Sequence, residues 1–202
     1  TLMHADPGAW DALMTWRARL TGDFIAAQVR AGASAAQLFD SWAGSLSPAD
    51  YRARVAPYSA LALSIARRAV SPTTGAPAPL IHFGTGTARL LADMRAAGAD
   101  AVGVDDRTDL AWAIDVLDGA GPEPCPVQGN LDPALLAAPW EVLAPAVDAC
   151  LEAGRAAPAH VVNLGHGVPP TTDPDVLTRL VARVHGSADW EATALAGWEA
   201  AA

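Results

Sequence analysis

The sequence predicts an α/β fold in which five short parallel strands alternate with helices. Two observations predict it. Apolar runs of strand length lie between longer segments with helical periodicity, a pattern typical of repeated β-α units. The runs are near-continuous rather than alternating, which indicates strands covered on both faces. This pattern leaves a closed β/α barrel and an open sheet as alternatives.

The helix starts are marked by capping residues. Gly32 stands where the first helix would take a left-handed cap, and Pro57 predicts a kink in the second. At four other points an Asp or Ser oxygen precedes a proline at the first helical position, where no amide hydrogen is lost. These pairs begin at Asp6, Ser47, Asp132 and Asp173. We expect helices over residues 7–31, 48–70, 87–97, 110–117, 139–153 and 174–185.

Five apolar runs form the predicted strands, and polar or glycine residues follow each of them. The runs cover residues 35–40, 79–83, 101–105, 125–131 and 160–166. The polar ends are residues 40–41, 84–86, 105–106, 128–130 and 163–166. Because parallel strands in barrels and open sheets bind ligands at their carboxyl ends, we expect a site built from several β-α loops.

Composition excludes several classes of function. The chain has 202 residues, 51% of them apolar, which is enough for one domain with a sizeable core. Its net charge is −9, with 13 arginines, no lysine and no basic cluster, so nucleic acid and anionic membranes are poor partners. No apolar stretch reaches the ~18 residues of a membrane span and no signal-peptide pattern is visible, so we expect a cytosolic protein. Cys125 and Cys150 lack metal-ligand spacing and are expected to be buried thiols.

Two strand ends carry motifs with more than one interpretation. In FGTGTARLL, residues 83–91, Arg89 stands where a dinucleotide fingerprint needs its third glycine, and no P-loop lysine follows. The loop is either a tight turn with positive φ or a substrate-facing turn whose amides hold an anion. Asp105 and Asp106 precede Arg107. The two carboxylates could divide acid and base roles, or one of them could cap the next helix.

Two further residue types bear on chemistry. Ser41 lacks a G-x-S-x-G elbow, so a hydroxyl that orients a ligand is expected there rather than a nucleophile. The five histidines show no H-E-x-x-H or His-Cys pattern, and we predict no metal site. His166 differs from the others because it ends a strand between two glycines.

Four motifs together resemble one enzyme family. They are QLFDSWAGSLSPADYRARVAPY, HFGTGTARLLADMRAAGADAVGVD, VQGNLDPALL and HVVNLGHGVPPTTDPDVLTRLVARVH. In this order and spacing they resemble uroporphyrinogen decarboxylase. The resemblance implies a (β/α)8 TIM barrel that acts as a homodimer without metal or organic cofactor. It also implies decarboxylation of the four acetate side chains of uroporphyrinogen III to give coproporphyrinogen III in haem biosynthesis.

The resemblance also sets what we expect of this chain. Five strands are too few for an eight-stranded barrel. Residues 1–186 are therefore expected to be a carboxy-terminal portion, about five of eight units, and residues 187–202 a tail of unknown role. Alone, this portion is expected to be inactive and to expose open sheet edges.

Three positions carry the family's substrate-binding residues. The serine of the F-[DE]-S motif and the histidine of N-L-G-H-G are Ser41 and His166, and Phe39 holds the place of the aromatic that lines the pocket. The family's catalytic aspartate, its arginines and a tyrosine lie upstream, so none is expected within this chain. Asp106 stands where the family usually has tryptophan.

Two alternatives stay open from the sequence. One is a related barrel methyltransferase that uses zinc, for which the His-x-Cys pattern is missing here. The other is a non-catalytic tetrapyrrole-binding remnant, which would bind a porphyrinogen without turnover.

Overall fold

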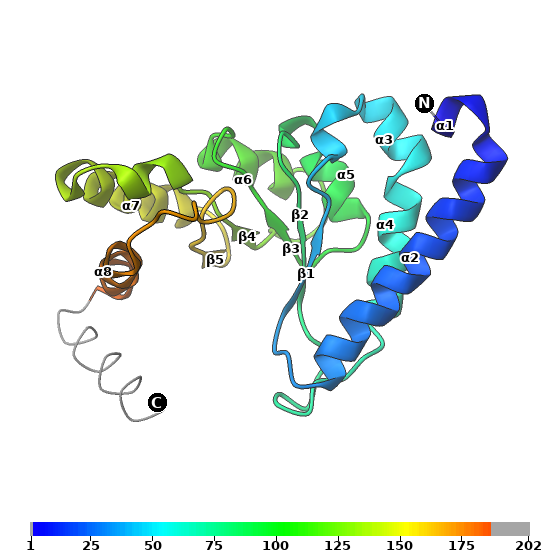
Figure 1. Ribbon diagram of the computed structural model, residues 1–202, viewed down its shortest axis with the longest axis horizontal. Helices are drawn as coiled ribbons and strands as arrows, with labels where there is room; N and C mark the ends of the chain where they lie inside the picture. Colours follow the sequence, from blue (N-terminus) through cyan, green and yellow to red (C-terminus); the bar gives the residue numbers. More distant parts are fainter. Residues whose placement is uncertain (1, 187–202) are drawn as a thin grey trace.

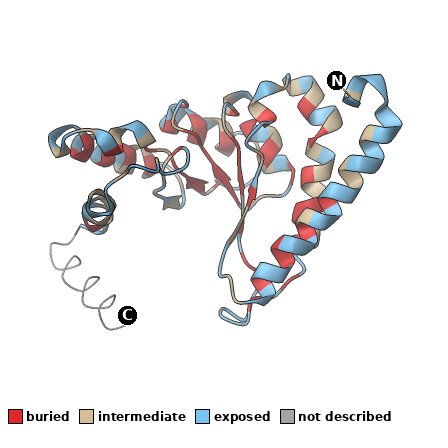
Figure 2. Cartoon of the chain, viewed as in Figure 1, coloured by how far each residue is buried: buried red, intermediate tan, exposed pale blue. Residues whose placement is uncertain are grey.

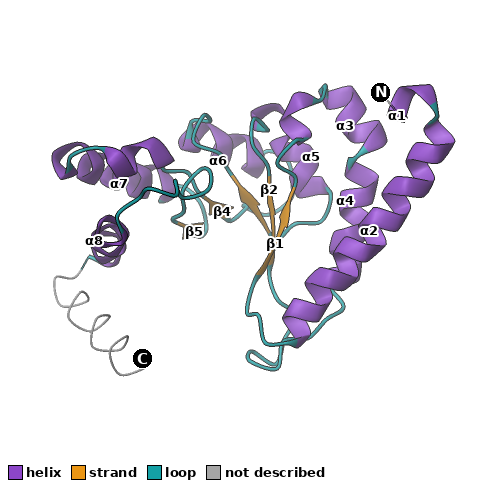
Figure 3. Ribbon diagram, viewed as in Figure 1, coloured by secondary structure: helices purple, strands orange, loops and turns teal. Residues whose placement is uncertain are grey.

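The computed structural model describes residues 2–186, and the predicted tail over residues 187–202 lies outside them. Five parallel strands form one sheet in the order β1-β2-β3-β4-β5, with helices along one side (Figures 1 and 3). The strands are β1 (Ala36–Phe39), β2 (Leu80–Phe83), β3 (Ala101–Gly103), β4 (Val127–Gln128) and β5 (His160–Val161). The order follows the chain without reversal, which is the arrangement of consecutive barrel units and not of a doubly wound sheet.

Most of the predicted helices and all four predicted helix caps are confirmed. Each of the four predicted caps accepts an amide hydrogen from the first helical turn, as Asp6 does from Ala9 and Ser47 from Asp50. The α-helices are α1 (Leu2–Ala5), α2 (Pro7–Arg30), α3 (Pro48–Arg54), α4 (Ala56–Ala66), α5 (Leu91–Ala96), α6 (Leu110–Asp118), α7 (Trp140–Gly154) and α8 (Pro174–His185). Short 3-10 helices are η1 (Ala43–Ser45), η2 (Ala88–Leu90) and η3 (Pro133–Ala137).

Two helix predictions need correction. The expected kinked helix over residues 48–70 is two separate helices, α3 and α4, that meet at Val55. Pro57 lies in the first turn of α4, where its missing amide hydrogen costs nothing, so it starts a helix and does not kink one. The expected helix over residues 87–97 is the 3-10 turn η2 followed by α5.

Apolar residues of the strands pack against the helices, and all residues of β3 and β4 are buried. Leu38 of β1 and Leu80 of β2 pack with Ile25 of α2 and Leu63 of α4. Further along, β3 and β4 pack on α6 through a second apolar cluster that includes Val102, Val104, Ile114, Leu117 and Val127. Figure 2 shows this buried layer between the strands and the helices.

The opposite face of the sheet is concave. Gln128 of β4 donates through Nε2 to Oε1 of Gln37 on β1, at 2.8 Å, although two strands lie between them. A hydrogen bond across non-neighbouring strands requires the sheet to curve, as a barrel wall does. We expected strands covered on both faces, and this is wrong at the ends of the sheet, where Phe39 is 67% and Val161 52% exposed. Within residues 2–186 β1 pairs with β2 alone and β5 with β4 alone.

Two predictions about the rest of the chain are also answered. Cys125 and Cys150 are free and buried, and burial raises the pKa of both thiols. Of the helices within residues 2–186, none is long and apolar enough to cross a membrane.

Candidate substrate site at the carboxyl ends of the strands

A cavity of about 470 Å³ lies at the carboxyl ends of β2 to β5. It brings His166, which sequence analysis singled out, together with Arg107, Asp106 and Thr85 from other strand ends. Asp132, Pro133, Gly167 and Pro169 complete its lining. The site is thus built from several β-α loops, as expected.

A buried carboxylate organises the middle of this edge. Asp105 is 2% exposed, and its Oδ2 accepts the amide hydrogen of Gly86 at 2.5 Å. Its Oδ1 accepts the hydroxyl hydrogen of Thr108 at 2.6 Å, and Nη2 of Arg107 lies 3.2 Å from Oδ2. Asp105 therefore ties the β2 loop to the β3 loop and holds one end of Arg107. The suggestion that Asp105 or Asp106 caps the next helix is wrong, because Asp109 caps α6.

The glycine loop after β2 is a structural turn. Gly86 has a φ of +68°, which favours glycine. The β1 loop approaches it so closely that a Cβ on Gly44 would lie 2.2 Å from the carbonyl oxygen of Thr85. The hydroxyl of Thr85 also donates to the carbonyl oxygen of Ser41 at 2.7 Å. The tight-turn interpretation is confirmed, and Thr85 in addition lines the cavity.

The loop that carries His166 follows β5. It is joined to the β4 loop by the bridge between Leu131 and Leu164, and Gly165 donates to the carbonyl oxygen of Leu131. A Cβ on Gly165 would lie 2.0 Å from the amide nitrogen of Asp106. Gly165 therefore makes room for the neighbouring backbone of the β3 loop.

The imidazole of His166 has a defined tautomer when it is neutral. The amide of Gly167 donates to Nδ1 of His166 at 2.7 Å. Because Nδ1 is the acceptor, Nε2 carries the ring hydrogen. The side chain is exposed, so His166 presents an N–H donor and not a lone pair to a ligand.

The other two predicted residues lie at the end of β1. Phe39 packs edge-to-face on Phe83 of β2, with ring centroids 5.9 Å apart. Gly103 of β3 leaves space for that ring, since a Cβ there would meet Phe83 at 2.7 Å. Ser41 is exposed. Neither Phe39 nor Ser41 lines the cavity that His166 lines. The structure therefore places these three residues along one edge of the sheet but not around one cavity.

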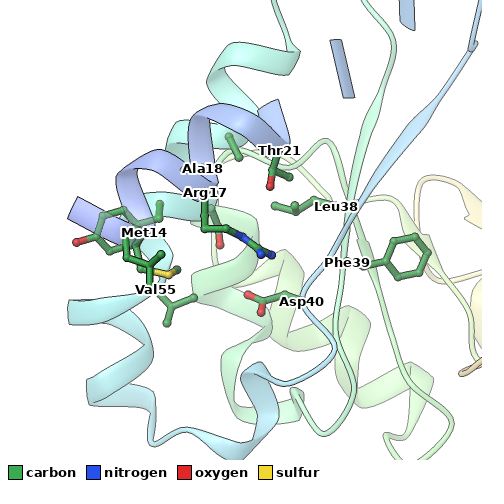
Figure 4. A pocket seen from close by; sticks show the side chains of 12 residues that line it. Met14, Arg17, Ala18, Thr21, Leu38, Phe39, Asp40 and Val55 are labelled. Carbon is green, nitrogen blue, oxygen red and sulfur yellow. The ribbon is translucent and has the colours of Figure 1, made fainter. Parts of the chain in front are cut away.

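A second cavity, of about 300 Å³, lies between α2 and β1. Figure 4 shows Arg17 and Asp40 beside it; Phe39 also lines it, with its ring directed to the other side of the strand. Its lining also includes Met14 and Leu38. Residues of α4, among them Ser59 and Ala62, also line it.

Known proteins identify the family. A sequence profile described as uroporphyrinogen decarboxylase (URO-D) matches residues 1–187. The chain belongs to the uroporphyrinogen decarboxylase family. It is 57% identical to the uroporphyrinogen decarboxylases of Leifsonia xyli and Arthrobacter sp., covering 92% of this chain in both and 51% and 50% of those proteins. The chain thus spans about half the length of the curated relatives it matches.

A solved structure supports the same fold. A methyltransferase from Methanosarcina mazei superposes with a TM-score of 0.66 at 20% identity, over 82% of this chain and 45% of that one. At this identity the likeness concerns the fold alone. With the family match it confirms the predicted α/β barrel architecture, of which residues 2–186 contain five β/α units.

Two residues of this part of the barrel were not singled out from the sequence. Arg107 was noted only beside its two acids, and nothing placed it with His166. His82 of β2 is fully buried, with Nδ1 3.2 Å from the carbonyl oxygen of Met94 and Nε2 3.8 Å from Asp40. The available signal was position, since each of these residues lies in or directly after a predicted strand. Among residues 2–186, no group of three or more His, Cys, Asp or Glu side chains is arranged to hold a metal ion.

Proposed function

We propose that the complete protein carrying this chain is a uroporphyrinogen decarboxylase, which removes four acetate carboxyl groups from uroporphyrinogen III to give coproporphyrinogen III. The observation that carries the proposal is the family match over residues 1–187, with relatives 57% identical that bear this name. The cavity at the carboxyl ends of the strands supports it, because barrel enzymes bind their substrates at that edge.

The reaction needs a place for the electrons of the broken bond. A proton added to the ring carbon next to the one that bears the acetate chain makes the ring a cationic electron sink that is conjugated with that chain. The bond to the carboxylate then breaks, its electron pair neutralises the ring, and CO2 leaves. A proton taken up by the exocyclic carbon and one lost from the ring restore the pyrrole and leave a methyl group. The protein must therefore stabilise a cation and hold several carboxylates at once.

The residues of this chain serve binding and orientation in the proposal. His166 donates through Nε2 to a substrate carboxylate, and the direction follows from the hydrogen bond that Nδ1 accepts from Gly167. Phe39, exposed on the concave face and packed on Phe83, offers an apolar wall for the macrocycle. Ser41 orients substrate through its hydroxyl, on a loop fixed by Thr85.

The cation-stabilising carboxylate and most of the arginines are expected upstream of this chain. With a net charge of −9, these 202 residues do not supply the positive field that a substrate with eight carboxylates requires. The free edge of β1 and the cavity under α2 offer a place for the strand and side chains of that upstream part. We propose that the complete enzyme is a cytosolic homodimer that uses no metal or organic cofactor.

An assay of uroporphyrinogen III conversion tests this function. The full-length protein should yield coproporphyrinogen III, read as coproporphyrin after oxidation, and should do so in the presence of EDTA. The isolated chain of residues 1–202 should give no product. Absence of decarboxylated products from the full-length protein, with the porphyrinogen still bound, would favour the non-catalytic alternative. Absence of product from a full-length protein that binds zinc but no porphyrinogen would favour the zinc-dependent methyltransferase.

A further inference from the structure

Arg107 is held in a way that suits it to bind an anion. Only one of its terminal nitrogens, Nη2, reaches the buried carboxylate of Asp105, at 3.2 Å, while the side chain as a whole is 65% exposed. A guanidinium has five N–H donors in a planar fork, so this contact leaves most of them for another partner. Pinning one end of the side chain also lowers the entropy lost when the other end binds.

The carboxylate of Asp105, which is the counter-charge of Arg107, also has other hydrogen-bond donors. Its two oxygens already accept hydrogens from Gly86 and Thr108 in addition to the contact with Arg107. Asp105 therefore anchors the guanidinium without occupying its fork. This contact orients the exposed side chain of Arg107 at the strand end.

The cavity around Arg107 contains both signs of charge. Arg107 and the Nε2–H donor of His166 face the same space, which also holds the carboxylates of Asp106 and Asp132. Asp132 is engaged in capping η3 through Oδ1, which accepts the amide hydrogen of Ala134. Asp106 is the acid that opposes an anion here, and it stands where the family usually has tryptophan.

We propose that Arg107 binds a carboxylate of the substrate in the cavity that it shares with His166. This inference rests on the proposed function, because the substrate class it names is a porphyrinogen that carries carboxylate side chains. A planar fork and a ring N–H are complementary to the two oxygens of a carboxylate. Arg107 is thereby an arginine of the substrate site supplied by this half of the protein.

Binding of uroporphyrin I, a fluorescent porphyrin with eight carboxylates, tests the inference in the full-length protein. Arg107→Met should weaken binding about 10- to 100-fold, the range for a charge-assisted hydrogen bond. The affinity of Arg107→Lys should lie between those of the parent and Arg107→Met, because lysine restores the charge but not the planar fork. Asp106→Asn should tighten binding, because it removes the opposing charge. Arg155→Met, at the exposed end of α7, is the matched control and should bind as the parent does.

Turnover separates this inference from the proposed function. In Arg107→Met the KM for uroporphyrinogen III should rise by a similar factor, with kcat changed less, because a binding contact and not a reacting group is lost. If the parent turns over and Arg107→Met and Arg107→Lys keep its Kd and KM within twofold, the inference is overturned while the function stands. If the parent shows no turnover but Arg107→Met still loses uroporphyrin I, the function fails and the carboxylate site stands.

Discussion

The two walls of the strand-end cavity are built differently. The wall that carries Arg107 rests on the buried carboxylate of Asp105 and on loops that interlock from β1 to β4. The wall that carries His166 is an exposed loop after the two-residue edge strand β5. Within residues 2–186, β3 has a neighbouring strand on each side, whereas β5 pairs with β4 alone. We infer that the wall that carries Arg107 is the more firmly held of the two.

The helices behind the two walls differ in the same way. α6 buries four residues, including Ile114 and Leu117, in the main apolar cluster. α8 buries Ala182 alone. Four apolar residues of α8 are only partly buried against the cluster on α7, namely Val176, Leu177, Leu180 and Val184. The Arg183–Asp148 ion pair, with Nε 2.8 Å from Oδ1, and Arg179 over the ring of Trp140 also join α8 to α7. We expect changes at the first wall to cost more stability than changes at the second.

The largest loss of stability is expected from Asp105→Ala in the full-length protein. The change leaves the amide of Gly86 and the buried hydroxyl of Thr108 without their acceptor and releases Arg107, which should cost roughly 2–6 kcal/mol of unfolding free energy. Chemical denaturation measures this. Asp23→Ala on the exposed side of α2 is the control and should change stability little. Equal losses in the two variants would contradict the central role of Asp105.

A smaller effect is expected where the two walls touch. Gly165→Ala should cost about 1–3 kcal/mol, because its Cβ would lie 2.0 Å from the amide nitrogen of Asp106. Gly167→Ala, two residues on, is the matched control. No described atom lies within 4 Å of the Cβ it would add, so thermal unfolding should be unchanged. If both variants unfold alike, the close approach at Gly165 is not what requires glycine there.

A still smaller effect is expected at the tie between α7 and α8. The hydrogen bond from Arg183 lowers the pKa of the Asp148 carboxyl. A lowered carboxyl pKa adds stability above the unfolded pKa of about 3.9, and this is lost as pH falls through the folded pKa. Asp148→Asn should thus slightly lower the melting temperature at pH 7, and the difference should vanish in acid. A difference that grows in acid would have the wrong sign.

The rate of cysteine alkylation should report how tightly the loops beside Asp105 are held. Burial raises the pKa of Cys125 and Cys150, so both should react slowly with iodoacetamide at pH 8 in the folded protein. Cys150 also contacts the carbonyl oxygen of Gly129, next to Asn130, whose side-chain amide donates to the main-chain carbonyl oxygen of Asp105. Asp105→Ala keeps that carbonyl oxygen but removes the carboxylate contacts that hold the same loop, so it should speed the alkylation of Cys150, whereas Gly167→Ala should not. Equal rates in these two variants would count against the linked loops.

Much of the fold could be predicted because its signals are local. The oxygen-proline caps at Asp6 and Ser47 and the apolar runs depend on neighbouring residues, and these elements lie close to where we expected them. The split between α3 and α4 was missed because Pro57 fits a helix start as well as a kink.

The site was predicted only in part, because its contacts join distant loops. The family motifs pointed to His166, but its meeting with Arg107 depends on the curvature of the sheet and on the close approach at Gly165. Likewise, the role of Asp105 arises from donors on two different loops. The spacing of residues along the chain carries no signal for such contacts.

A structure of the full-length protein with coproporphyrin bound tests the central claim most directly. The account predicts one porphyrin carboxylate within about 3 Å of both the Arg107 guanidinium and Nε2 of His166, with the macrocycle against Phe39. A porphyrin bound elsewhere, with Arg107 and His166 both facing solvent, would contradict it.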